Sequence, residues 1–326
     1  MTAVPLDVRI SLLRQYGSFT QAYSATFQPG LRHFGDEHGF IAYKKVGKTA
    51  MVLGDPVAPA FLTGHLIGDF VKDHPDSAFW QISHPVASAL AGHGFLINEL
   101  GYETRLDLAT YTLAGQRRRN LRKAAQRMAK LGYSIRECAI SHLDAGAVIA
   151  VSAAWRRTRT VRNREAAFLT RPISIERDDD VRWFCAHTGE KDMVGFCVCD
   201  PIYEAGDIIG YSTASRQLPD ANAMIGHALK RHAIEVFQSE GRRWLTLGLS
   251  PADGIEDRDF NRDWACRRLL RFAYTNGLFN RFVYPLQGHA AHKRQFGGTT
   301  YQTYAAISAR PALLRLIKLL RACEIF

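Results

Sequence analysis

The second half of the sequence places three histidines close to basic side chains. His227 lies on a predicted helix, and His289 and His292 come just before Lys293. An imidazole titrates near neutral pH and can take a proton from an attacking nucleophile, so the candidate general bases are His227 and either His289 or His292. A structural role is the alternative for each of them.

A run of basic residues lies in the middle of the chain. The stretch GQRRRNLRKAAQRMAKLGYS, residues 115–134, contains no acidic side chain that would neutralise it through i,i+4 ion pairs. One interpretation is a cationic face that contacts the phosphates of a nucleic acid or of an anionic lipid. The other is a solvated helix surface whose apolar residues pack inward. The candidate phosphate contacts are Arg117, Arg118, Arg119, Arg122 and Lys123, followed by Arg127 and Lys130.

The C-terminal stretch RPALLRLIKLLRACEIF has a pattern typical of an amphipathic helix. Leucines and Ile317 form a broad apolar face, and basic residues recur on the other side, which fits a helix lying on an anionic membrane surface. The alternative is a terminal helix that docks on the core and leaves its basic face in water. The basic residues are Arg310, Arg315, Lys318 and Arg321.

Composition narrows the class of protein. The 326 residues are 47% hydrophobic, enough for real cores, and the formal charge of +11 favours polyanionic partners. The six cysteines lack the spacing of a metal site or a redox pair, which predicts reduced thiols and neither metal nor cofactor. No stretch reaches the roughly 18 apolar residues that span a bilayer. We expect a cytoplasmic protein with peripheral contact to the inner face of the membrane.

Periodicity predicts the elements that must position these residues. The first unit reads as a hairpin, a helix at 60–72, a strand at 78–83, a short helix and a strand pair at 95–100 and 103–109. After the basic helix, a second unit has strands at 133–138, 181–189, 192–202, 207–215, 244–250 and 301–308, with helices at 143–157, 221–240 and 262–276. The predicted divisions are a first lobe (1–115), a bridging basic helix (116–132), a second lobe that carries the chemistry (133–308) and an amphipathic C-terminal helix (309–326).

The order of elements in the second unit resembles the GNAT acyltransferase fold. In that fold the sheet opens between its fourth and fifth strands and the acyl donor enters the gap, which here lies between residues 207–215 and 244–250. A CoA donor is normally held by a glycine-rich turn at the start of the next helix. The turn in this chain has no glycine between Arg216 and Met224, so a standard CoA pyrophosphate loop is not expected.

Four stretches together are similar to the phosphatidylglycerol lysyltransferase family, which moves an aminoacyl group from tRNA to a membrane lipid. They are FIAYKKVGKTAMVLGDPVAP, GQRRRNLRKAAQRMAKLGYSI, GRRWLTLGLSPADG and FVYPLQGHAAHKRQFGGTTYQTYAAIS, in that order along the chain. The resemblance implies an α/β (α+β) fold of two tandem GNAT-like lobes bridged by the basic helix.

The resemblance also implies site residues. Arg216 and Lys293 are expected to hold a phosphate or the oxyanion of the tetrahedral intermediate, and Phe296 comes with the same stretch as Lys293. Thr213 stands where lysine-transferring members carry an acid, and Gly226 stands near a second acidic position, which argues against lysine specificity. The substrate-binding candidates are Thr213, Tyr211, Phe296 and Asp253, with core or loop-capping roles as the alternative for Tyr211 and Asp253.

Three functions remain open at this point. The first is an aminoacyl-tRNA-dependent transferase that acts on a membrane lipid or another amphiphile, without lysine specificity. The second is a GNAT acyltransferase that acylates an amine from an acyl-CoA or acyl-carrier-protein thioester. The third is a non-catalytic module that binds anionic lipid or RNA. The oligomeric state is left open.

Overall fold

The computed structural model describes residues 4–158, 165–175, 178–189, 192–256, 259–308 and 312–324. Arg310 of the C-terminal stretch lies outside these residues. None of the described helices is long and apolar enough to cross a membrane.

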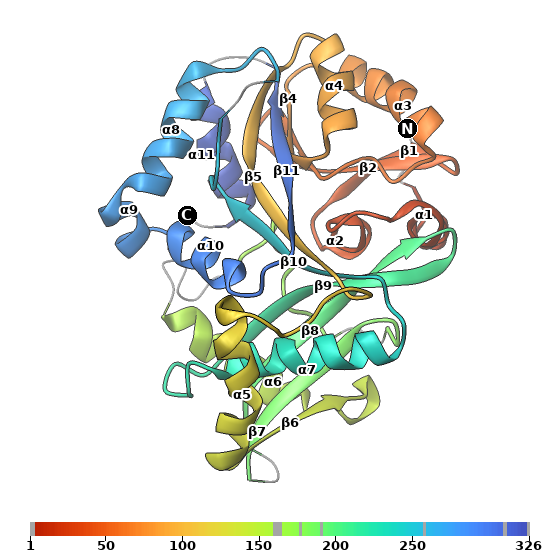
Figure 1. The fold of residues 1–326 in the computed structure, drawn as a ribbon. Coiled ribbons are helices and arrows are strands. Elements are labelled where there is room, and N and C mark those ends of the chain that lie inside the picture. Colours follow the sequence, from red (N-terminus) through yellow and green to blue (C-terminus); the bar gives the residue numbers. More distant parts are fainter. Residues whose placement is uncertain are drawn as a thin grey trace.

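The first half of the chain forms two short N-terminal helices and then the elements of one lobe (Figure 1). Its elements are α1 (Leu6–Tyr16), α2 (Ala22–Phe27), β1 (Arg32–Asp36), β2 (Gly39–Val46), β3 (Thr49–Leu53), α3 (Ala60–Asp73), β4 (Ser77–Ile82), α4 (His84–Gly92) and β5 (Leu96–Asp107).

The second half begins with the basic helix and again contains three antiparallel strands, then a helix and a parallel strand. Its elements are η1 (Gln116–Arg118), α5 (Arg119–Lys130), β6 (Tyr133–Cys138), η2 (Ile140–His142), α6 (Ala145–Arg157), β7 (Arg182–Thr188), β8 (Asp192–Glu204), β9 (Asp207–Gln217), α7 (Ile225–Ser239), β10 (Trp244–Pro251), α8 (Trp264–Thr275), α9 (Gly277–Phe282), α10 (Leu286–Arg294), β11 (Thr299–Ile307) and α11 (Ala312–Ala322).

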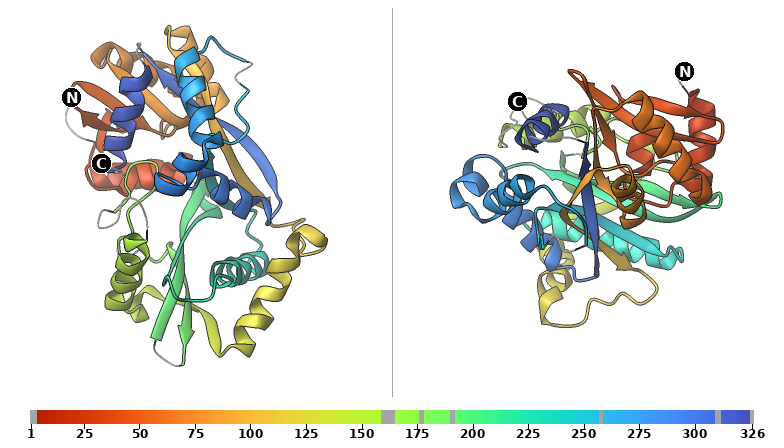
Figure 2. Two further views of the ribbon diagram at one scale, coloured as in Figure 1. Left: turned by 90° about the vertical axis from the view of Figure 1, so that its left-hand side faces the viewer. Right: turned by 90° about the horizontal axis from the view of Figure 1, so that it is seen from above.

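The eleven strands of the described residues join one sheet in the order β1-β2-β3-β4-β11-β5-β10-β9-β8-β7-β6. Within it, β3 pairs with β4 in parallel across α3, and β9 pairs with β10 in parallel across α7, so each half contains the same crossover unit. This repetition confirms the tandem GNAT-like fold that the sequence predicts. Helices cover both faces of the sheet (Figure 2).

The two halves share their central strands. β11, at the end of the chain, lies between β4 and β5, while β5 from the first half pairs with β10 of the second. The lobes are therefore joined through backbone hydrogen bonds as well as through the basic helix. Helix α1 also packs on β8 of the second lobe.

The strand pair predicted at 95–100 and 103–109 is wrong, because the structure has one continuous strand, β5. Gly101, predicted to lie in the turn between them, has φ +138° and lies at a register shift against β11. Its missing side chain lets Ser250 O approach to a point 2.2 Å from where a Cβ would stand. Glycine here bends the strand instead of reversing it.

Helix α11 docks on the first lobe, and part of its basic face points inward. This corrects the expectation that its basic residues all lie on the side away from the core. Arg315 is buried, forms an ion pair with Asp76 and donates to Thr49 Oγ1 over 2.7 Å. Lys318 also donates to Thr49 Oγ1. Leu319 is buried, whereas Leu313 and Leu314 remain about half exposed.

Candidate functional site

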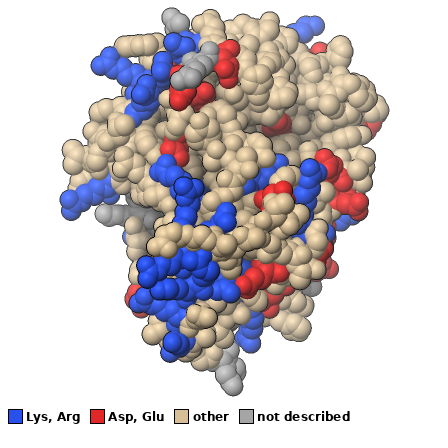
Figure 3. Space-filling model, viewed as in Figure 1, with Lys and Arg blue, Asp and Glu red and all other residues tan. Residues whose placement is uncertain are grey.

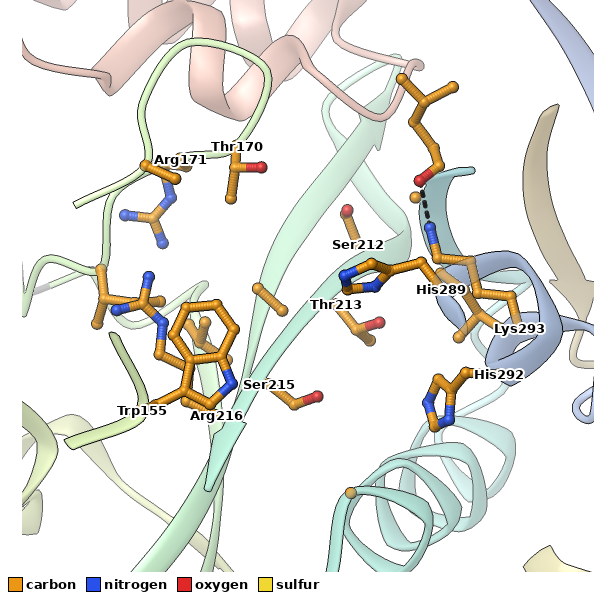
Figure 4. A pocket seen from close by; sticks show the side chains of 18 of the residues that line it. Trp155, Thr170, Arg171, Ser212, Thr213, Ser215, Arg216, His289, His292 and Lys293 are labelled. Atoms are coloured by element: carbon orange, nitrogen blue, oxygen red, sulfur yellow. Dashed lines mark hydrogen bonds between the residues drawn. The ribbon is translucent and has the colours of Figure 1, made fainter. Parts of the chain in front are cut away.

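The sheet opens between β9 and β10, as expected from the sequence. The two strands pair only from Gly210 to Ser212, and beyond Thr246 they diverge. The opening is a cavity of about 860 Å³ whose walls come from β9, β10, α7, α10, the segment 166–173 and the loop before α2 (Figure 4).

Lys293 lies in the wall of this cavity, on α10. Its Nζ donates a hydrogen bond to Leu249 O over 2.5 Å, on β10 where that strand shifts register. Burial lowers the pKa of Lys293 to about 7; Glu103 counteracts this in part, and the charge of Lys230 lowers it further. Lys293 is therefore an amine that exchanges its proton near neutral pH.

A second amine, Lys230, faces the cavity from α7. It is buried, and its Nζ donates to Ser215 Oγ on β9 over 2.6 Å. Burial lowers the pKa of Lys230 as well. Lys230 is absent from the residues predicted from sequence, although a lysine within an apolar helix face was a signal that could have identified it.

Two of the three candidate histidines, His227 and His292, lie next to each other. His292 lines the cavity, and its ring meets that of His227 edge to face with centroids 4.7 Å apart. Burial, reinforced by the charge of Lys230, lowers the pKa of His292 to about 2, and burial also lowers that of His227. A base with so low a pKa has little affinity for a proton at neutral pH, so Lys293 is better suited to that role.

Arg216 lies in the cavity wall with its charge already paired. Both of its terminal nitrogens bind the carboxylate of Glu165, one of them over 3.0 Å, and it also donates to Ser152 Oγ. The guanidinium lies over the ring of Trp155, 4.8 Å from its centroid. Because its charge is already paired, Arg216 forms part of the cavity wall and is less available to hold a phosphate than the sequence predicts.

The remaining substrate-binding candidates are not all brought together. Thr213 lines the cavity and donates to Thr246 O over 3.2 Å at the point where the strands separate. Tyr211 and Phe296 are buried in the core, where Tyr211 stacks on Phe237. Asp253 accepts a hydrogen bond from Tyr274 Oη over 2.7 Å and pairs with Arg294, the last residue of α10.

A buried hydrogen-bond network behind the cavity was not predicted. Glu103 on β5 accepts from Thr20 Oγ1 and from Gln81 Nε2, each over 2.6 Å, and Gln81 accepts from Gln21 over 2.8 Å. Thr20 and Gln21 line the cavity, so the first lobe supplies part of the wall. The residues lie too far apart in the sequence for any motif to link them.

Some of the cations of η1 and α5 form hydrogen bonds within the protein, and the others lie on its surface. Arg118 donates to Phe296 O over 3.0 Å, and Arg122 donates to Leu113 O over 2.5 Å. These two arginines therefore bind η1 and α5 to the segment that precedes them and to the turn between α10 and β11. The other five cations are exposed: Arg117, Arg119, Lys123, Arg127 and Lys130. In Figure 3, Lys and Arg side chains gather at the lower left, where Figure 1 shows α5 in the same view.

Comparison with known proteins assigns the chain to a protein family. Residues 10–307 match the family profile described as phosphatidylglycerol lysyltransferase, C-terminal. The chain belongs to this family. The similarity expected from the four stretches is confirmed.

Relatives of the phosphatidylglycerol lysyltransferase family are distant and longer. The chain is 23% identical over 301 residues to the phosphatidylglycerol lysyltransferase of Staphylococcus haemolyticus (strain JCSC1435), covering 86% of this chain and 34% of that protein. It is 22% identical over 269 residues to that of Bacillus subtilis (strain 168), covering 80% of this chain and 30% of that protein. The chain thus spans about a third of the length of these relatives.

Two solved structures share the fold. The C-terminal domain of a putative lysylphosphatidylglycerol synthetase from Agrobacterium fabrum has a TM-score of 0.79 at 19% identity, with coverage of 96% of this chain and 95% of that one. L-PGS from Bacillus licheniformis has a TM-score of 0.76 at 20% identity, with 98% and 96% coverage. The agreement in fold covers both lobes.

Proposed function

We propose that this chain transfers an aminoacyl group from tRNA to an anionic membrane lipid, and that the transfer takes place in the cavity between β9 and β10. Membership of the phosphatidylglycerol lysyltransferase family supports this reaction class. The cavity supports it because its polar wall carries amines and hydroxyls, and an aminoacyl ester is already activated, so positioning and proton transfer are sufficient.

The backbone amides at the N-terminus of α7 already have hydrogen-bond partners, and this observation favours tRNA over CoA as the donor. In a CoA-dependent acyltransferase, free amides at this helix start would hold the pyrophosphate. Here Met224 N donates to Asn222 Oδ1 over 3.0 Å, and Gly226 N donates to Gln217 Oε1 over 3.2 Å. The amides of Ile225 and His227 are also bonded within the turn, to Asn222 O and Met224 O. A pyrophosphate would have to displace these contacts.

Lys293 acts as the base in the proposed reaction. Its neutral amine takes the proton of the acceptor hydroxyl while that oxygen bonds to the ester carbonyl carbon. The Lys230 ammonium is placed to stabilise the negative oxygen that develops. The intermediate collapses by breaking the bond to the tRNA ribose oxygen, which takes up the proton, and Lys293 returns to the neutral state.

The charges around the cavity favour a neutral aminoacyl group over lysine. Among the described residues that line the cavity, Asp200 is the one carboxylate, and both of its oxygens already bind Arg171, over 2.5 and 2.9 Å. A lysyl side chain would enter beside Lys230 and Lys293 with no free carboxylate to pair with. Thr213, where an acid is expected in lysine-transferring members, has only a hydroxyl.

A donor assay tests the proposal. The protein is incubated with phosphatidylglycerol vesicles and either tRNA charged with a labelled amino-acid mixture or labelled acyl-CoA, and label is counted in the organic phase with and without RNase. We expect RNase-sensitive transfer in which neutral amino acids exceed lysine, and a rise in the lysine share in Thr213→Asp. RNase-resistant transfer from acyl-CoA, or no transfer from charged tRNA, would contradict the proposal.

A further inference from the structure

Four large apolar side chains stand exposed on the adjoining helices α8 and α9. Trp264 and Phe272 lie about two turns apart on α8, with exposed fractions of 63% and 57%. Leu278 and Phe282 lie about one turn apart on α9, with exposed fractions of 68% and 61%. Single exposed apolar residues are ordinary, but a group on neighbouring helices marks an interaction surface. We call this surface the α8–α9 face.

Arginines interleave with the apolar side chains of the α8–α9 face. Arg268, Arg271 and Arg281 are exposed, and neither helix contains an acidic residue. Arg268 Cζ lies 5.2 Å from the ring centroid of Trp264, and Arg281 Cζ lies 5.1 Å from that of Phe282. A mixture of aromatic rings and arginines matches the boundary between acyl chains and anionic headgroups.

The α8–α9 face leads directly to the cavity. Phe282 ends α9, and the next residues, Val283 to Pro285, line the cavity. The ring of Tyr284 stacks on that of His289, 5.1 Å away and one turn before Lys293 on α10. Helix α11 contacts α8, and the two lie side by side in the left view of Figure 2, above α10.

We infer that the α8–α9 face docks on an anionic phospholipid bilayer. Its four apolar side chains enter the headgroup boundary, its arginines contact lipid phosphates, and the mouth of the cavity then lies at the membrane surface. The inference moves the main lipid contact from α11 to α8 and α9, because α11 uses Arg315 and Lys318 to bind Thr49. The inference rests on the proposed function only in naming a lipid as the acceptor.

Flotation of the full chain with vesicles tests the docking without requiring turnover. Vesicles of phosphatidylglycerol and phosphatidylcholine are compared with pure phosphatidylcholine, using Phe272→Ser/Phe282→Ser. The matched control is Phe61→Ser on α3, where the side chain is 80% exposed. We expect at least tenfold weaker binding of the double variant to the anionic vesicles and unchanged binding of the control. The wild type should also show a blue shift of tryptophan fluorescence on binding, and Trp264→Phe should lose it.

Two results would overturn the docking. One is equal binding of the wild type and the double variant, or no binding by either. The other is self-association of the wild type through this face, seen as a dimer in sedimentation that the double variant abolishes, with no effect on vesicles. Docking and catalysis fail separately: vesicle binding through this face without transfer rejects the proposed function, whereas transfer to detergent-dispersed lipid without vesicle binding rejects the docking.

Discussion

At the scale of single residues, the cavity depends on side chains whose surroundings differ from what their sequence neighbours indicate. The resemblance identifies Lys293, but its lowered pKa follows from burial and from Lys230, which is 63 positions away along the chain. Arg216 was predicted as an anion-binding residue, and its partner Glu165 lies 51 positions away. Sequence reasoning finds such residues by type, whereas their protonation and pairing depend on tertiary contacts.

Replacing Lys293 by Met separates its role in transfer from its effect on stability. Transfer should fall by at least about 100-fold, the usual contribution of a general base. The wild-type rate should rise as the pH increases through about 7, because only the neutral amine accepts a proton.

The same substitution should stabilise the fold at neutral pH. The unfolded lysine keeps its proton up to about pH 10.4, whereas the folded one loses it near 7, so folding releases a proton between these values and wild-type stability rises with pH there. Lys293→Met should therefore melt at a higher temperature than the wild type at pH 7, with the difference shrinking toward pH 10. A melting difference independent of pH would contradict the assigned pKa.

At the scale of elements, patterning predicts most of the strands and long helices because their apolar periods are regular. It missed α1 and α2, which pack on β8 of the second lobe, and also β1, α9 and α10, and it divided β5 at Gly101. It also expected the whole basic side of α11 to face either anionic lipid or water, although Arg315 pairs with Asp76 and donates to Thr49 on the first lobe. Local patterns cannot indicate such partners.

Because β5 bends at Gly101, we expect alanine substitutions at two glycines to lower the free energy of unfolding by different amounts. Gly101→Ala would put a Cβ 2.2 Å from Ser250 O at a positive φ, and should lower the free energy of unfolding by about 2–4 kcal/mol. Gly94→Ala, also at positive φ but with open space around it, should cost about 1 kcal/mol. Urea unfolding of both variants measures the difference, and equal costs would show that β5 relaxes around the added methyl group.

The exposed cations of α5 predict salt-dependent tRNA binding. Arg119→Gln/Lys123→Gln/Arg127→Gln should weaken binding and reduce the slope of log K against log salt by about one unit for each phosphate that the variant no longer neutralises. Lys45→Gln/Lys48→Gln, which removes exposed cations from the first lobe, is the control and should leave the slope unchanged. Filter binding over a salt series gives the slopes; the same slope for all three proteins would make α5 a solvated surface.

At the scale of the whole molecule, the repeated crossover units follow from the sequence, but the exchange of central strands does not. β11 belongs to the second half of the chain and completes the first lobe, because it pairs with both β4 and β5. Strand order depends on which edges meet in space, and both halves have similar apolar patterns. The cavity also depends on both halves of the chain, since Thr20 and Gln21 of the first half complete its wall.

The shared strands predict that the halves do not fold separately. A fragment of residues 133–326 would carry β11 without its two neighbours and β10 without β5, and residues 1–132 would lack β11. Neither fragment should show cooperative thermal unfolding alone, whereas coexpression of the two should restore it. A cooperative transition in the isolated second fragment would show that its sheet is complete without β5.

The central claim is that aminoacyl transfer takes place in the opening between β9 and β10. The most direct measurement is the rate of label transfer from charged tRNA to phosphatidylglycerol by Thr213→Trp, which fills the opening, beside the wild type and Ser239→Trp, which adds the same ring at an exposed site at the end of α7. We predict at least about a 100-fold loss for Thr213→Trp, with tRNA and vesicle binding retained, and a wild-type rate for the control. A Thr213→Trp rate within about twofold of the wild type would place the reaction elsewhere.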